Sequence, residues 1–331
     1  MLRLARPILK LGSSATDLVD GKSLVRIDVC VITYQRPKGL QRLLGGLQQL
    51  DLPDPSLDVR VVVVDNDPAE SARVVCSDAS RWLRHPLRYR VEKRRGIPQA
   101  RNTAIAAAMD GADFIAFIDD DEVPDAGWLG ELLRVQRSSG ADAVAGPCET
   151  VFEETPPRWI ESGGFFERPR HATGARIAYA YTHNVLVSTR ALAGMNRLFD
   201  EGMALTGSSD TEFFERFARH GQRIVWADGA MVREWVPPTR TTLAWLLQRS
   251  FRVGTATSLI ERTRRRPPVR AGRVLLHGAW CVAKGGGLAL LGSLRGRAGV
   301  ARGLRLVATG LGRLAGLTGY RYEEYRASHG S

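Results

Sequence analysis

Four consecutive acidic residues follow a short apolar run near the middle of the chain. Residues 114–118 are all apolar, and residues 119–122 are three aspartates and a glutamate. Clustered carboxylates repel one another unless a positive group neutralises them, and hard divalent cations prefer such oxygen ligands. The pattern predicts a Mg²⁺ or Mn²⁺ ion, and through it a diphosphate, at Asp119 and Asp121. The alternative is a helix start, in which Asp121 and Glu122 favour the positive end of a following helix.

The elements around this cluster predict where it lies. Five apolar residues without polar alternation are typical of a strand that is buried on both faces of a parallel sheet. Two further apolar runs, residues 29–32 and 61–64, also end in polar residues. Leucines at helical spacing between these runs, and an alanine-rich segment at residues 98–109, predict intervening helices. Strands alternating with helices predict an α/β fold with a mostly parallel sheet, which binds ligands at the carboxyl edge.

Seven short motifs occur in an order that resembles a known family. They lie at residues 31–37, 63–67, 96–102, 117–122, 181–184, 210–214 and 234–237. In this order and spacing the chain resembles a family 2 glycosyltransferase of the GT-A fold, over roughly residues 26–255. It is most similar to bacterial exopolysaccharide enzymes of the succinoglycan glucosyltransferase type. The resemblance implies a GT-A (Rossmann-like) mixed, mostly parallel sheet that is flanked by helices.

The resemblance also implies a sugar-nucleotide site around the acid cluster. A divalent metal, Mn²⁺ or Mg²⁺, would act as a Lewis acid on the charge that grows on the departing diphosphate. Asp121 corresponds to the direct metal ligand, with Asp119 beside the metal and the nucleotide, and Asp120 nearer the ribose. The other residues that correspond to nucleotide contacts are Thr33, Tyr34, Arg36, Asp65 and Arg101. Asp65 would read the pyrimidine base, although it also suits a simple turn, and Arg101 also suits an exposed helix charge.

Inverting transfer needs a base that takes the proton from the attacking hydroxyl group, and Asp210 corresponds to that base. Ser209 and Glu212 have the spacing of a capping box that opens a helix. In the first turn of such a helix the dipole would stabilise the Asp210 carboxylate and weaken it as a base. The family usually carries Glu-Asp here, so Ser209 is a departure that keeps the base and removes its acidic neighbour.

Later residues are candidates for the metal and the acceptor. Glu234 stands where many relatives carry a histidine that completes the metal or diphosphate site, so it is a candidate metal ligand, an acceptor contact or an ordinary surface residue. His183 and Asn184 could face the sugar or pack in the core. Trp159 could stack on a sugar ring or fill a core. We expect acceptor contacts in the long irregular segment at residues 153–173.

The positive charge of the chain is concentrated at its C-terminal end. The net charge is +12, and residues 262–331 alone hold fourteen Lys and Arg against two acidic residues. In a predicted helix over residues 301–317, Arg302, Arg305 and Arg313 share one face, and leucines lie opposite. Such a helix is typical of contact with an anionic membrane surface. No nucleic-acid module is recognisable, so we expect no nucleic acid partner; the remaining alternative is that these helices pack back on the catalytic domain.

The sequence therefore predicts three parts: an N-terminal extension (1–25), a GT-A catalytic domain (26–260) and a basic, amphipathic tail (261–331). Within the tail, residues 274–294 are long enough to span a membrane, although His277, Lys284 and three glycines weaken that interpretation. Four cysteines without paired spacing predict reduced thiols in a cytosolic protein.

The predicted activity is inverting, metal-dependent hexosyl transfer. The donor would be a UDP-sugar, with UDP-glucose as first candidate, and the acceptor a polyprenyl-linked oligosaccharide in exopolysaccharide biosynthesis. The enzyme would sit peripherally on the cytoplasmic face of the cell membrane. Two alternatives remain open. A sugar nucleotidyltransferase shares the sheet and the paired acids, but the chain has no Gly-rich, lysine-containing loop after the first strand. A non-catalytic scaffold would bind nucleotide or membrane without turnover.

Overall fold

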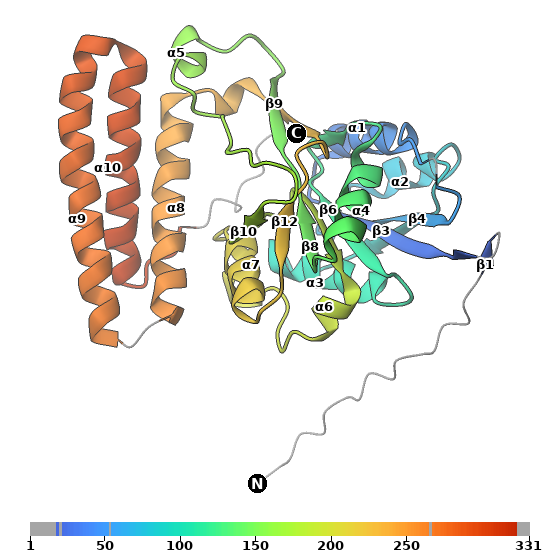
Figure 1. Ribbon diagram of the computed structural model, residues 1–331. Helices are drawn as coiled ribbons and strands as arrows, with labels where there is room; N and C mark the ends of the chain where they lie inside the picture. Colours follow the sequence, from blue (N-terminus) through green and yellow to red (C-terminus); the bar gives the residue numbers. More distant parts are fainter. Residues whose placement is uncertain (1–17, 20–21, 53, 265–266, 323–331) are drawn as a thin grey trace.

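The computed structural model describes residues 18–19, 22–52, 54–264 and 267–322, and its centre is an eight-stranded mixed sheet (Figure 1). The strand order is β10-β12-β8-β11-β6-β3-β4-β5. The strands are β3 (Val25–Thr33), β4 (Leu57–Asp65), β5 (Leu87–Val91), β6 (Phe114–Ile118), β8 (Ala143–Ala145), β10 (Arg176–Ile177), β11 (Asn184–Ser188) and β12 (Ile224–Trp226). Strands β5, β4, β3 and β6 are parallel, whereas β11 runs antiparallel between β6 and β8. The predicted mostly parallel sheet is confirmed, and all three predicted apolar strands lie in it.

Two smaller sheets accompany the large one. The first joins β7 (Glu122–Pro124), β13 (Val232–Val236) and β9 (Cys148–Phe152), and the second pairs β1 (Leu18–Val19) with β2 (Lys22–Ser23). Because the chain enters β7 directly after the acid cluster, no helix begins there. The next helix, α4 (Trp128–Ser139), starts six residues after Glu122. The helix-start interpretation of the acid cluster is therefore wrong.

Helices cover both faces of the large sheet. On one face α1 (Pro37–Gln48), α2 (Arg73–Ala79) and α4 contribute to a core that includes Leu40, Leu43, Leu44 and Leu47. On the other face lie α3 (Ile97–Ala108), α6 (Thr189–Ala193) and α7 (Ser209–Arg219), with Phe213, Phe214 and Phe217 fully buried. The apolar strands are thus buried on both sides, which is why they show no polar alternation.

The C-terminal part is a bundle of three helices beside the sheet domain: α8 (Leu243–Arg264), α9 (Pro267–Gly292) and α10 (Arg297–Leu317). In Figure 1, α8 lies next to the sheet domain and α9 is the outermost helix. A small core of Ile160, Phe165, Trp245, Leu246 and Ala301 joins the bundle to α5 (Arg158–Glu161). The predicted boundary at residue 260 falls inside α8, while most of the predicted extension (1–25) lies outside the described residues.

Three single turns of 3₁₀ helix complete the chain: η1 (Glu201–Met203), η2 (Pro238–Arg240) and η3 (Ser293–Arg295). Tyr179 and Tyr181 lie in an irregular segment between β10 and β11. This segment and η2 both reach the carboxyl edge of the sheet.

Candidate active site

A cavity of about 720 Å³ opens at the edge where β3 and β6 end. The acid cluster lies there because it directly follows β6, a central strand of the sheet that ends at Ile118. Strand β11 is antiparallel and pairs its first residue, Asn184, with Ile118, so the segment before it reaches the same edge. The first turns of α3 and α7 and four residues of α8 complete the wall. This volume is in the range of sites that enclose a small ligand.

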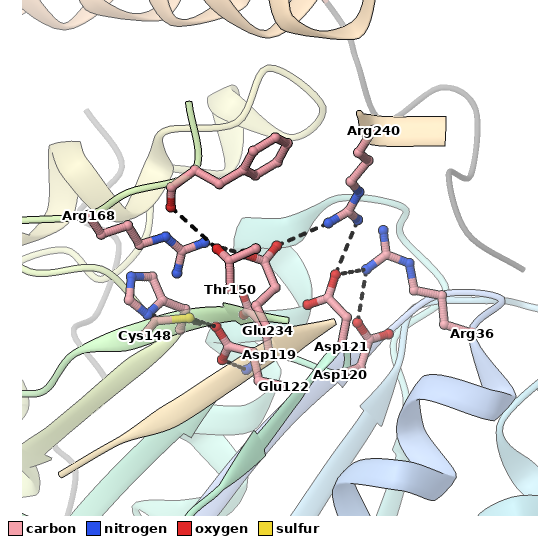
Figure 2. Close-up of polar contacts among 12 residues, drawn as sticks. Arg36, Asp119, Asp120, Asp121, Glu122, Cys148, Thr150, Arg168, Glu234 and Arg240 are labelled. Atoms are coloured by element: carbon pink, nitrogen blue, oxygen red, sulfur yellow. Dashed lines mark hydrogen bonds and ion pairs between the residues drawn. The ribbon is translucent and has the colours of Figure 1, made fainter. Parts of the chain in front are cut away.

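Arginines neutralise the acid cluster from two sides (Figure 2). Arg36 Nη1 lies 3.1 Å from both Asp120 Oδ1 and Asp121 Oδ2. Arg240, at the end of η2, donates from Nη2 to Asp121 Oδ2 at 3.1 Å. Asp120 also accepts a 2.8 Å hydrogen bond from Thr33 Oγ1, which ties the end of β3 to the cluster. Thr33, Arg36, Asp120 and Asp121 are therefore brought together as predicted.

Glu234 belongs to the same charged network. It lies on β13 and accepts from Arg240 Nη1 at 3.0 Å and from Arg168 Nη2. Arg240 therefore bridges Glu234 and Asp121, two residues predicted as metal ligands. The glutamate faces the cavity, which does not fit the interpretation of an ordinary surface residue.

The protonation of the cluster reflects burial and crowding. Loss of hydration raises the pKa of Asp119 to about 7; Arg101 opposes this shift, and the neighbouring acids, including Asp210, add to it. Burial likewise raises the pKa of Asp120, against the effect of Arg36. Burial also disfavours the charged form of Asp121, but Arg240 and Arg36 outweigh it and hold the pKa of that carboxyl below its usual value.

The donor set fits a hard divalent cation. Asp119 and Asp121 offer carboxylate oxygens, which Mg²⁺ and Mn²⁺ prefer. The carboxylate of Asp119 is partly exposed to the cavity and lies 3.9 Å from Arg101 Nη2. Loss of hydration, and after it the neighbouring acids, raise the pKa of this carboxyl, and a bound cation would offset both effects.

Glu122 holds the backbone of the acid cluster in place. Its Oε2 accepts the backbone N–H of Asp119 at 3.0 Å, and the Cys148 thiol donates to its Oε1 at 3.3 Å. With His183 these residues bring three ligand atoms within 4.8 Å of one another. Burial raises the pKa of both Glu122 and Cys148 and lowers that of His183, so all three favour their neutral forms. The group therefore holds the turn after β6 in place.

Arg101 and Asp210 reach the cavity from the two helices that start at this edge. Arg101 Nη1 donates to Ser209 Oγ at 3.3 Å, and its guanidinium lies over the ring of Phe199. Asp210 lies in the first turn of α7 and lines the cavity. Arg101 is nine-tenths buried, so the exposed-charge interpretation of this residue is wrong.

The predicted capping box is also wrong. Helix α7 begins at Ser209, its N-cap is Ser208 with φ +60°, and that cap makes no side-chain hydrogen bond. The Ser209 hydroxyl instead accepts from Arg101, and Glu212 pairs with Arg197 and Arg216. Ser208 is one of three non-glycine residues with positive φ in the described chain, and Gln35, between Tyr34 and Arg36, is another. Strained backbone of this kind gathers at functional sites.

Tyr34 forms the cavity wall beside the end of β3. The guanidinium of Arg95 lies 4.2 Å from its ring centre, and both residues line the cavity. A flat aromatic face beside a cation is suited to stacking on a base. Tyr34 therefore lies where a nucleotide contact would need it, and its contact with the base stays a prediction.

Three predicted contacts are not available at the cavity. Asp65 lies behind the wall, fully buried, and accepts from Asp67 N, Ala72 N and Tyr89 Oη, so it serves the turn. Asn184 lines the cavity, but its amide is saturated by Trp128 Nε1 and the carbonyls of Pro147 and Ala230. Trp159 packs edge-on against Phe165 in the small core. For these three residues the structural interpretations hold.

Several functional candidates escaped sequence reasoning. Arg168 and Arg240 reach the acids from loops that carry no recognised motif, although Arg168 lies in the irregular segment expected to contact the acceptor. The α8 residues Trp245, Arg249, Arg252 and Val253 also line the cavity. The signal for these residues was the segment at 246–254, which contains Arg249 and Arg252 and belongs to the resemblance to the succinoglycan enzymes.

Comparisons with known proteins agree with this geometry. A family model described as glycosyl transferase family 2 matches residues 28–196. The succinoglycan biosynthesis protein ExoM of Rhizobium meliloti (strain 1021) is 36% identical over 231 residues, which cover 70% of this chain and 73% of that protein. A pre-mycofactocin glycosyltransferase of Mycobacterium tuberculosis is 29% identical over 308 residues, covering 88% of this chain and 60% of that protein.

Solved structures share the fold. The mannosyltransferase PcManGT from Pyrobaculum calidifontis, in complex with GDP-Man and Mn²⁺, has a TM-score of 0.58 at 19% identity, covering 88% of this chain and 87% of its own. S. aureus TarS in complex with UDP-GlcNAc has a TM-score of 0.51 at 16% identity, covering 90% and 93%. At such identities the likeness shows the GT-A fold alone. The family match and the identity to ExoM go further, and they show that the chain belongs to glycosyltransferase family 2.

Proposed function

We propose that this glycosyltransferase moves a sugar, with inversion and with a divalent metal, from a UDP-sugar to a lipid-linked oligosaccharide during exopolysaccharide assembly. One observation carries the proposal. Asp119, Asp121 and Asp210 meet in a single cavity, although they come from the end of β6 and the start of α7. Transfer needs this juxtaposition, because the acceptor hydroxyl that loses its proton attacks the same anomeric carbon that the diphosphate leaves.

The cavity divides into a donor part and an acceptor part. On the donor side Tyr34 would stack on the base, Asp120 would lie near the ribose, and Arg36, Arg101 and Arg240 would contact the diphosphate. Asp65 would act on the base only through the turn that it holds. UDP-glucose is our first candidate donor, because ExoM is named for succinoglycan biosynthesis.

Asp119 and Asp121 would hold Mn²⁺ or Mg²⁺, with Glu234 beside them. When bound, the metal supplies positive charge for the departing diphosphate. Arg36 and Arg240 now neutralise Asp121, so a metal–donor complex would compete for Asp121 and free both guanidiniums for phosphate oxygens. Asp210 would take the proton from the acceptor hydroxyl.

The acceptor would enter between α8 and the segment that precedes β11. His183, Tyr181 and Arg168 line that side, with Trp245 and Arg249 from α8. We propose a polyprenyl-linked oligosaccharide as acceptor, with the enzyme on the cytoplasmic face of an anionic membrane. The support is the relationship to ExoM and the basic C-terminal segment at residues 262–331, whose excess of positive charge equals the net charge of the whole chain.

A donor-binding and hydrolysis experiment tests the proposal. We expect UDP-glucose with MnCl₂ to raise the unfolding temperature and to release UDP slowly without acceptor, and EDTA to abolish both effects. Ligand at a hundredfold excess over its dissociation constant stabilises a protein by about 2.7 kcal/mol. Asp121→Asn should lose the manganese-dependent shift and at least a hundredfold in UDP release.

The matched control is Asp78→Asn, the same change at an exposed position on α2, which should behave like the wild type. Equal UDP release from Asp121→Asn and wild type, in manganese and in EDTA, would overturn metal-dependent transfer. Pyrophosphate release from UTP and a sugar 1-phosphate would instead indicate a nucleotidyltransferase. Binding without any turnover in the presence of membrane extracts would indicate a scaffold.

A further inference from the structure

Helix α9 is the outermost element of the bundle, and it is held there by α10. In Figure 1, α10 lies between α9 and α8, so α9 is separated from the sheet domain by two helices. The inner side of α9 packs on α10 over most of its 26 residues. Its opposite side faces outward, and no described element covers that side.

Glycines bring these two helices into backbone contact. Gly278, Gly285 and Gly292 recur every seven residues on the inner side of α9. A Cβ at Gly285 would lie 2.8 Å from the carbonyl oxygen of Gly303, and one at Gly292 would lie 2.4 Å from the carbonyl carbon of Gly299. Small residues therefore form the seam, and the large side chains of α9 are left on its outward side. Helix pairs in lipid are packed in this way.

The outward side of α9 is apolar along its described length. Large side chains that stand at least two-fifths exposed on this helix and in the turn after it are Leu275, Leu276, Trp280, Leu288, Leu290, Leu291 and Leu294. Leu276, Leu290 and Leu294 are more than 70% exposed. Residues Ala271–Arg295 are long and apolar enough to cross a membrane by length and composition. Large apolar side chains exposed side by side in this way mark an interaction surface.

The charges around this patch identify its partner. Residues 267–317 contain eight Lys and Arg and no acidic residue. Arg273 lies near one end of the patch and Arg295 near the other, and Lys284 lies over the ring of Trp280 at 4.5 Å. An apolar stripe bordered by cations matches the boundary between acyl chains and anionic headgroups. Two copies of this face would bring like charges together, which disfavours a self-association surface.

The contacts of the α10 arginines determine how α9 can lie relative to a membrane. Arg302 donates to the carbonyl oxygens of Ser162 and Gly163, Arg305 to Ser250 Oγ, and Arg313 to Glu261. These charged groups are bound to the rest of the protein, so α10 cannot be surrounded by hydrocarbon. A spanning α9 would need lipid on all sides and would have to leave α10.

We infer that α9 lies in the plane of an anionic bilayer, with the outward face defined by Leu276, Trp280, Leu290 and Leu294 embedded among the acyl chains. This inference rests on the proposed function in taking a cell membrane as the partner. It assigns the contact to the apolar side of α9 and not to the arginine face of α10.

Vesicle sedimentation of the full chain tests the assignment. We expect the wild type to bind vesicles of 30% phosphatidylglycerol in phosphatidylcholine, with a blue shift of tryptophan emission that Trp280→Phe removes. Leu276→Glu with Leu290→Glu should lower the partition coefficient at least tenfold. Val74→Glu, which also replaces an exposed aliphatic side chain by glutamate but on α2, where the position is 70% exposed, should leave binding unchanged.

A measurement of UDP release without acceptor distinguishes a failure of this inference from a failure of the proposed function. The double variant should keep wild-type release, because neither leucine lines the cavity. Wild-type vesicle binding by the double variant would overturn the assignment. A wild-type dimer in light scattering that the double variant breaks, without vesicle binding by either protein, would also overturn it and would give the face to a second copy.

Discussion

Asp210 stands in the first turn of α7, one residue after a serine that is bound to Arg101. Its Oδ1 accepts the backbone N–H of Thr211 at 2.8 Å, and its carboxylate faces the cavity. We expect Asp210→Asn to lower the transfer rate by about 10²–10⁴, the range that a positioned base contributes. Binding of UDP with manganese should remain, because the proposed donor contacts lie at the ends of β3 and β6, on α3 and on η2, and not on α7.

The measurement is sugar transfer to a membrane extract under saturating donor, with binding followed by thermal unfolding. Asp78→Asn again serves as the surface control. An Asp210→Asn protein that keeps more than a tenth of the wild-type rate would end the assignment of Asp210 as the base.

His85 gives the molecule a pH-dependent stability that is independent of the active site. It is more than nine-tenths buried, and burial, aided by Arg84, lowers its pKa below the usual value. A histidine that is neutral when folded binds its proton more readily in the unfolded chain, so its contribution is lost as the pH falls through the unfolded pKa near 6.5. We expect the free energy of unfolding to fall less between pH 7.5 and 5.5 in His85→Gln than in the wild type. Urea titrations at the two pH values measure this difference, and an equal or larger fall in the variant would contradict it.

At the scale of single residues, the sequence predicted the position of those that directly follow a strand or end it. Thr33, Asp119 and Asp121 meet because parallel strands end at one edge of the sheet. Asp65 is placed equally well by that rule, yet its oxygens are occupied by backbone N–H groups and Tyr89. Such local hydrogen bonds depend on turn geometry, which residue types alone do not determine. Arg168 and Arg240 were missed because long side chains on loops can reach many positions.

At the scale of elements, the glycines of α9 and α10 lead to two predictions of opposite sign for the free energy of unfolding. A Cβ at Gly303 would lie 2.2 Å from the backbone nitrogen of Ala289, whereas one at Gly287 would have nothing within 4 Å. We expect Gly303→Ala to lower the free energy of unfolding by about 1–3 kcal/mol, because the helices must separate. Gly287→Ala should raise it by up to about 1 kcal/mol through helix propensity.

Urea unfolding followed by circular dichroism measures both changes. The two substitutions add the same methyl group to helices of the same pair, so each is the control for the other. Equal stabilisation by both would mean that the backbones do not touch at Gly303.

The central strands and helices were predictable because their apolar periodicity reflects burial on two faces of one sheet. The helix predicted at residues 98–109 is α3 (Ile97–Ala108), which begins and ends one residue earlier than predicted. The path of the chain after β6 was not predictable, since the acid cluster leads into a strand that pairs with β13 and not into a helix, which was the alternative interpretation. Pairing with a segment more than a hundred residues away leaves no local pattern in the sequence.

For the whole molecule, the predicted basic helix exists, but its arginine face is turned inward. The periodicity of residues 301–317 correctly placed Arg302, Arg305 and Arg313 on one side of α10. It could not tell whether lipid headgroups or protein groups meet that side, because both supply oxygen acceptors. In the structure the acceptors are backbone carbonyls, a serine and Glu261, and the outer apolar surface belongs to α9 instead.

The order of the three helices in the bundle sets a minimum length for any substrate that is anchored in the bilayer. Helices α8 and α10 separate the catalytic cavity from the embedded side of α9, and packed helix axes are about 8–10 Å apart. With α9 embedded as proposed, a lipid-borne glycan would have to extend past two helical layers, on the order of 20 Å, before its terminal hydroxyl reached Asp210, the proposed base. Short early intermediates would not reach that far, so the spacer built into the fold would reserve this step for a chain that has already grown.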